Sequence, residues 1–136
     1  VQIWDCDLTN SWSGIEIKAT PKRGGYVRGV SVRDCTASRL LVHAVPYNDD
    51  GEAAPRQPIF SHLSFERLTL TGRGLRDGSF ENVEPIELAG FDAPGHELRD
   101  VVLDGITVEN ETGIMTLLVQ FCRGLTIRDL TCTARK

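Results

Sequence analysis

The chain has 136 residues, which is enough for one domain with a substantial core and too few for two. Its net charge of −4 offers no basic field to nucleic acid or to an anionic membrane surface, so we expect neither as a partner. No apolar run approaches the roughly 18 residues that a membrane-spanning helix needs. The four cysteines lack the spacing of a zinc site, so no metal or cofactor is expected either.

A recurring strand pattern is the strongest internal signal. Apolar residues occupy the first, third, sixth and eighth positions of a motif whose copies start 24 to 38 residues apart. The copies lie, in chain order, at 1–8, 30–37, 63–70, 101–108 and 125–132. A constant motif with variable spacing predicts one repeated structural unit that carries loops of different length. The change of apolar spacing from two to three inside the motif predicts a bend between two short strands.

Each interval between two motif copies contains a second predicted strand. These strands lie at 14–20, 39–45, 85–90 and 116–121, and their apolar residues are two apart. No helical periodicity persists for three turns. The pattern predicts an all-β, right-handed parallel β-helix of about four to five coils, with residues 1–136 as a single domain. Antiparallel sandwiches also contain many short strands, but they do not require one pattern to recur in phase.

Stacking the second strands in register predicts which side chains share a face. The inward set is Ile15/Ile17, Leu40/Val42, Ile86/Leu88 and Leu117/Val119. Two outward columns follow, one of Lys18, His43, Ala89 and Gln120, the other of Glu16, Leu41, Glu87 and Leu118. Neighbouring members of a column would lie about 4.8 Å apart.

Four stretches of the chain resemble one enzyme family. "GIEIKATPKRGGYVRGVSVRDCT" is similar to the segment of family 28 glycoside hydrolases, the polygalacturonase-like enzymes, that carries their R-I-K motif and the glycine-rich turn after it. "QPIFSHLSFERLTL" resembles the next coil. "PIELAGFDAPGHELRDVVLDGITVEN" and "GIMTLLVQFCRGLTIRDLTCTA" resemble the last coils of bacterial members. The resemblance implies that the chain is the C-terminal part of a larger β-helix, truncated on its N-terminal side.

The resemblance also implies a function, which is the inverting hydrolysis of glycosidic bonds in pectin-type polysaccharides or oligogalacturonides. The family's catalytic carboxylates lie upstream of R-I-K, so we expect the catalytic residues to be missing here and the chain alone to be inactive. Lys18 matches the lysine of R-I-K, which helps to hold the substrate carboxylate. Glu16 stands where the family has arginine, and this departure leaves the sugar preference open.

Three further residues are candidates for substrate binding. His43 shares the outward column of Lys18 and can donate to a sugar hydroxyl or carboxylate. Arg23 follows in the basic turn at the predicted rim of the cleft, and Tyr47 lies in a polar loop where its ring can stack on a pyranose.

Two other functions fit the same fold. The first is a non-catalytic carbohydrate-binding or structural β-helix module. The second is a pectate-lyase-like eliminase, although no calcium-binding carboxylate cluster or catalytic arginine stands out for it. A β-helix cut between coils would expose apolar ends, so we also expect self-association or a rearranged first coil. The resemblance favours an extracellular or periplasmic location, and a cytoplasmic one stays open.

Overall fold

The computed structural model describes residues 1–46 and 51–135, and within these ranges the protein is all-β, as predicted. None of the described residues forms a helix with the length and hydropathy to cross a membrane. The strands are β1 (Gln2–Trp4), β2 (Asp7–Leu8), β3 (Gly14–Ala19), β4 (Tyr26–Ala37), β5 (Arg39–Ala44), β6 (Ile59–Leu70), β7 (Arg73–Arg76), β8 (Ser79–Asn82), β9 (Ile86–Ala89), β10 (Leu98–Glu111), β11 (Leu117–Gln120) and β12 (Cys122–Arg135).

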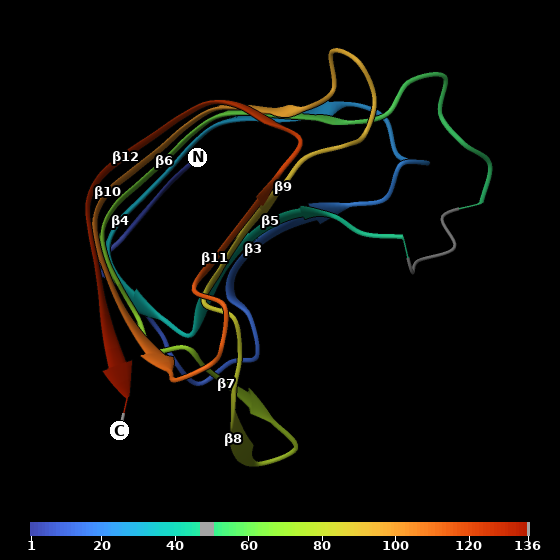
Figure 1. Ribbon diagram of the computed structural model, residues 1–136. Coiled ribbons are helices and arrows are strands. Elements are labelled where there is room, and N and C mark those ends of the chain that lie inside the picture. Colours follow the sequence, from blue (N-terminus) through green and yellow to red (C-terminus); the bar gives the residue numbers. More distant parts are fainter. Residues whose placement is uncertain (47–50, 136) are drawn as a thin grey trace.

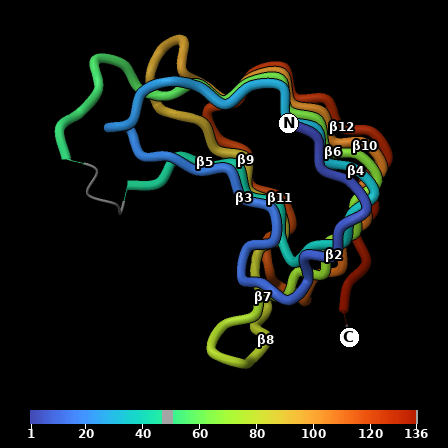
Figure 2. The backbone as a smooth tube through the Cα atoms, turned by 180° about the vertical axis from the view of Figure 1, so that it is seen from behind, coloured from blue at the N-terminus to red at the C-terminus, as the bar shows by residue number. Residues whose placement is uncertain are grey.

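Two parallel sheets make up most of the molecule. One has the order β1-β4-β6-β10-β12, with β2 also paired to β4, and the other has the order β3-β5-β9-β11. In both sheets the order in space is the order along the chain, because the chain passes from one sheet to the other and back. Figure 1 shows the long strands β4, β6, β10 and β12 bending together around one side, and Figure 2 shows β3, β5, β9 and β11 lying side by side.

The bend predicted inside the repeated motif is a residue in the left-handed region of backbone space. Strand pairing aligns the same motif position in neighbouring copies, as in Arg33↔Glu66 and Cys35↔Leu68 around the bend. The bend residues have φ between 50° and 71°, and they are Asp5, Asp34, Arg67, Gly105 and Asp129. A second aligned row comes just before the motif, with φ between 55° and 71° at Gly29, His62, Asp100 and Gly124. One left-handed residue therefore turns the strand without breaking the pairing on either side.

An ion pair connects two neighbouring bend residues. Arg67 Nε donates to Asp34 Oδ1 at 2.6 Å and Arg67 Nη2 donates to Asp34 Oδ2 at 3.1 Å. This bidentate contact lowers the pKa of the Asp34 carboxyl. At pH values above the ordinary pKa of an aspartate, the pair therefore stabilises the bend. This stabilisation is lost as the pH falls through the lowered pKa of Asp34.

The core fills the space between the two parallel sheets. It is formed by the apolar positions of the motif together with alternate residues of the second strands, and its largest fully buried members are Phe60, Phe65, Phe91, Leu40, Leu63, Leu68 and Leu70. The rings of Phe60 and Phe91 contact one another with centroids 5.4 Å apart. The core side chains are thus aliphatic and aromatic apart from cysteines such as the buried Cys35, and they contribute hydrophobic burial in successive layers.

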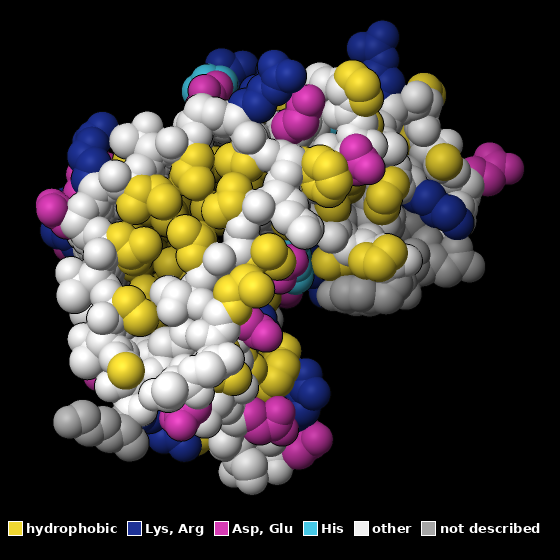
Figure 3. Space-filling model, in the orientation of Figure 1, with side chains coloured by type: hydrophobic (Ala, Val, Ile, Leu, Met, Phe, Trp, Pro, Cys, Tyr) yellow, Lys and Arg dark blue, Asp and Glu magenta, His cyan; other side chains and the backbone are white. Residues whose placement is uncertain are grey.

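The last strand of each sheet leaves its apolar side chains partly uncovered. Leu117 packs against the core, but Val119, which was predicted to face inward, is exposed because β11 is an edge strand of its sheet among the described residues. Ile127 of β12 is exposed for the same reason. Figure 3 shows hydrophobic side chains gathered on this face. Self-association through such a face stays a prediction.

The glycine at the bend of β10 offers a test of the bend geometry. Gly105 has φ 71°, and a β-carbon there would find space, with its nearest neighbour at 3.5 Å. We predict that Gly105→Ala lowers the free energy of unfolding by about 1–2 kcal/mol, purely through backbone strain. The matched control Thr107→Ala, at an exposed extended position of the same strand, should change it by less than about 0.5 kcal/mol. Chemical denaturation measures both, and equal losses would contradict the bend.

Candidate functional site

The outer face of β3, β5, β9 and β11 brings together the charged residues that the sequence singled out. The pairing sets Lys18 beside His43 and Glu16 beside Leu41, and it continues from Leu41 to Glu87 and from His43 to Ala89. This confirms the register of the two predicted outward columns. Leu41 differs from its expected exposure, because only 2% of it is accessible although it faces away from the core. It lies between Glu16 and Glu87 in its column.

A histidine between two glutamates forms the centre of this face. His43 Nε2 lies 2.9 Å from Glu16 Oε2, and His43 Nδ1 lies 3.3 Å from Glu87 Oε2. Lys18 Nζ is 3.9 Å from the other oxygen of Glu16. Only 12% of the His43 side chain is exposed, and each of its two ring nitrogens faces one carboxylate. We call Glu16, His43 and Glu87 the Glu-His-Glu row. It presents carboxylate acceptors to anything that lies on the face.

An arginine-tryptophan stack adjoins the Glu-His-Glu row. Arg39 shares the outward parity of His43 in β5, and its buried Nε donates to the Glu84 carbonyl at 2.9 Å. Its guanidinium lies 5.7 Å from the centroid of the Trp12 ring, over which Arg76 stacks at 3.6 Å. Burial lowers the pKa of Arg39, although Glu84 and the two glutamates of the row act in the opposite direction.

The hairpin of β7 and β8 is attached through this stack. β7 pairs antiparallel with β8, and the Leu75 amide donates to the Ser11 carbonyl at 3.0 Å. Gly74 lies so close to the Trp12 ring that a β-carbon there would come within 2.7 Å of it. Figure 2 shows the hairpin projecting from the rest of the chain. The hairpin therefore holds Trp12 in place and forms one wall beside the outer face.

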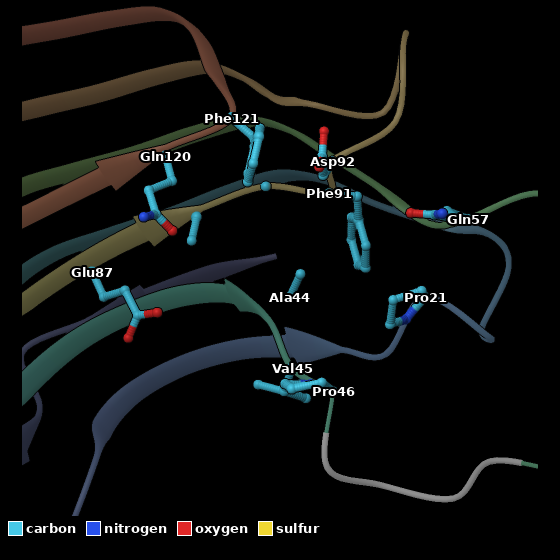
Figure 4. Close-up of a pocket in the computed structure, with 12 residues that line it drawn as sticks. Pro21, Ala44, Val45, Pro46, Gln57, Glu87, Phe91, Asp92, Gln120 and Phe121 are labelled. Atoms are coloured by element: carbon cyan, nitrogen blue, oxygen red, sulfur yellow. The ribbon is translucent and has the colours of Figure 1, made fainter.

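A pocket of about 310 Å³ lies at the carboxyl ends of the same strands. Its lining residues are Pro21, Ala44, Val45, Pro46, Gln57, Glu87, Ala89, Gly90, Phe91, Asp92, Gln120 and Phe121. Figure 4 shows Glu87 and Gln120 on one side of it and Pro21 and Gln57 on the other. Glu87 belongs both to the pocket and to the Glu-His-Glu row, so the two form one continuous surface.

An exposed aromatic residue with an unusual backbone lies at this pocket. Phe121 has φ 47°, a conformation that costs energy for a bulky side chain, and 45% of it is exposed. Its carbonyl accepts a hydrogen bond from the Leu98 amide at 2.9 Å, which fixes the turn from β11 into β12. Positive φ also occurs at the bends of the long strands, so the exposure of Phe121 at the pocket is what makes it a candidate ligand contact. Phe121 is therefore the strongest candidate for a ligand contact that the sequence did not reveal.

Of the two remaining predicted site residues, the structure describes Arg23. Arg23 is exposed in the turn after β3, where its amide donates to the Thr20 carbonyl at 3.1 Å. It follows Pro21, which lines the pocket, by two residues. Tyr47 lies outside the described residues. The structure thus brings together Lys18, Glu16 and His43.

Sequence signals for the missed residues differ in strength. The outward parity of Arg39 could have been read from its place two residues before Leu41, but its burial against Trp12 could not. Nothing in the sequence announces the positive φ of Phe121, because it depends on how tightly β11 turns into β12.

Comparison with known proteins assigns the chain to no family. No family model, curated protein or solved structure matches the chain. Among the residues that the structure describes, no group of three or more His, Cys, Asp or Glu side chains is placed to hold a metal ion. The function is therefore argued from the site itself.

The two arginines on Trp12 should differ in their contribution to stability. We predict that Arg39→Gln lowers the free energy of unfolding by about 2–3 kcal/mol, because it leaves the Glu84 carbonyl without its buried donor. Arg76→Gln removes only a stack at the outer side of the ring and should cost less than about 1 kcal/mol. Urea unfolding followed by tryptophan fluorescence measures both, and a larger loss in Arg76→Gln would contradict the greater weight given to the buried hydrogen bond of Arg39.

Proposed function

We propose that the chain is a stretch of right-handed parallel β-helix. The identical order of strands along the chain and in space, in both parallel sheets, supports this architecture. The in-register pairing of every motif copy supports it too. The right-handed sense follows from the general rule that crossover connections between parallel strands of one sheet are almost always right-handed. The β7-β8 hairpin is then an insertion in the connection from β6 to β9.

We further propose that this stretch is the C-terminal portion of a polygalacturonase-like glycoside hydrolase and that the outer face of β3, β5, β9 and β11 binds its saccharide. One observation carries the proposal: an exposed aromatic residue, Phe121, lines a pocket that continues into the Glu-His-Glu row. A sugar presents an apolar ring face and many hydroxyls, so it needs an aromatic surface with polar groups beside it. Gln120 and Glu87 supply such groups next to Phe121.

The charges on this face favour a particular kind of sugar. Lys18 has Glu16 within 3.9 Å, so the cation expected to hold a uronate is already offset by a carboxylate. Glu87 adds a second negative charge beside His43. Carboxylates accept hydrogen bonds from hydroxyls but repel other carboxylates. The face is therefore suited to a pectin-type saccharide with few free carboxylates, rather than to a fully charged oligogalacturonide.

A non-catalytic carbohydrate-binding module is the second candidate, and the engagement of His43 favours it. Both ring nitrogens already face carboxylates, at 2.9 and 3.3 Å. With both nitrogens directed at carboxylates, the ring has no nitrogen in place to exchange a proton with a substrate. Under both functions the chain itself binds saccharide without hydrolysing it. Release of reducing sugar by the purified chain would contradict this part of the proposal.

Phe121 gives the direct test of the saccharide face. We predict that Phe121→Ala weakens the binding of pectin-derived oligosaccharides at least tenfold in calorimetric titration, because the stacking surface is lost. Phe80→Ala is a matched control, since Phe80 is equally exposed at 45% but lies on the β7-β8 hairpin and does not line the pocket. The proposal fails if neither neutral nor acidic oligosaccharides bind the unmodified chain, or if the two variants lose affinity equally.

Glu16 should control the choice between neutral and acidic sugars. We predict that Glu16→Gln raises the affinity for trigalacturonate at least threefold, because it removes a negative charge that repels the carboxylates of the sugar. Affinity for a neutral galactan oligosaccharide should not rise. Glu81→Gln, a loss of the same charge on the exposed hairpin strand β8, controls for net charge. An equal gain in both variants would mean that Glu16 has no local role.

A further inference from the structure

A second concavity, of about 360 Å³, lies on the outer side of the other sheet, at the beginning of β4, β6 and β10. Its lining residues are Tyr26, Arg28, Ile59, Ser61, His62 and Arg99. We call this the Arg-Ser-Arg pocket. Each polar residue that lines it carries at least one N–H or O–H donor, and none is a carboxylate. In a chain of net charge −4, a concavity lined in this way is a local exception.

Strand pairing places the two arginines on either side of the serine. Arg28 pairs with Ser61, and Ser61 pairs with Arg99. The preceding residues Phe60 and Leu98 belong to the core, so this row faces outward. At the usual strand spacing, the two arginine stems are about 9–10 Å apart. Ser61 is only 6% exposed, so its short side chain forms a floor between two long ones.

The donors in this pocket are incompletely used. No carboxylate of the described residues lies within ion-pair distance of Arg28. Arg99 donates from Nη2 to the Gly95 carbonyl at 3.0 Å and has Glu97 at 3.9 Å, while its buried Nε has no hydrogen-bond partner. His62 Nε2 already faces the Asp100 carboxylate at 3.5 Å, so the two arginines supply the main donors. The pocket therefore has spare hydrogen-bonding capacity for an anion.

The directions of these donors indicate the shape of the anion. A planar carboxylate is satisfied by a single guanidinium fork. The Arg-Ser-Arg pocket instead offers donors from two opposite sides and from the floor, which matches the three terminal oxygens of a tetrahedral ester. Tyr26 and Ile59 lie side by side at the mouth, paired across β4 and β6, and Tyr26 is largely exposed. They provide an apolar surface for whatever carries the ester.

We propose that the Arg-Ser-Arg pocket binds a sulfate or phosphate monoester. Its oxyanion lies between Arg28 and Arg99 above Ser61, and the ring that bears it lies against Tyr26 and Ile59. This site is on the opposite sheet from the proposed saccharide face, and its argument does not depend on that function. Sulfate and phosphate share the chemistry that the pocket recognises, so separate probes distinguish them.

The test is calorimetric titration of the full chain at constant ionic strength with four probes: p-nitrophenyl sulfate, p-nitrophenyl phosphate, inorganic phosphate and acetate. We expect at least one p-nitrophenyl ester to bind with a Kd in the millimolar range or below, and acetate at least tenfold more weakly. Inorganic phosphate should bind more weakly than the preferred ester because it has no ring to contact Tyr26. The preference between the two esters identifies the source of the oxyanion.

Two variants decide whether the Arg-Ser-Arg pocket is responsible. Arg28→Gln should weaken the binding of the preferred ester at least tenfold, and because Arg28 is exposed the variant should fold normally. Arg128→Gln removes the same charge from an exposed position of β12, a strand that does not line the pocket. This variant should leave the affinity within twofold. The proposal is overturned if neither ester binds, if acetate binds as tightly, or if both variants lose affinity equally.

Discussion

In-register pairing between parallel strands is the constraint on which the rest of the structure depends. Side chains alternate between the two faces of a strand, so a slip of one residue would move every core residue of that strand to the outside. The pairing of Val30 with Leu63, and of Leu63 with Val101, keeps the apolar positions of successive motif copies in one row. The same register fixes the left-handed residues at the bends, which is why they too form aligned rows.

The outer faces follow from the same constraint. Equivalent positions of successive strands lie about 4.8 Å apart, so charged residues that are distant in sequence must pair, repel or leave space for a ligand. On the face of β3, β5 and β9 they pair, and His43 receives a glutamate on each side. Between β4 and β10 two arginines flank a serine and leave a concavity. The two proposed sites thus differ in what the register places side by side.

Much of the fold could be predicted from the sequence because its pattern is periodic. The all-β class, the bends inside the motif and the adjacency of Lys18 and His43 follow from spacing alone. The burial of Leu41 could not be predicted, since it depends on how its neighbours in the column pack around it. The stack of Arg39 on Trp12 depends on how an inserted hairpin folds back, and the strain at Phe121 depends on one tight turn. Periodicity carries no information about these contacts.

Mapping a saccharide titration onto the chain by NMR tests the central claim most directly. We expect a neutral pectin-derived oligosaccharide to shift the amide signals of Glu87, Gln120 and Phe121 and the ring signals of His43. The signals of Arg28 and Arg99, on the other sheet, should not move. Shifts confined to the other sheet, or no shifts at saturating oligosaccharide, would contradict the assignment of the saccharide to the outer face of β3, β5, β9 and β11.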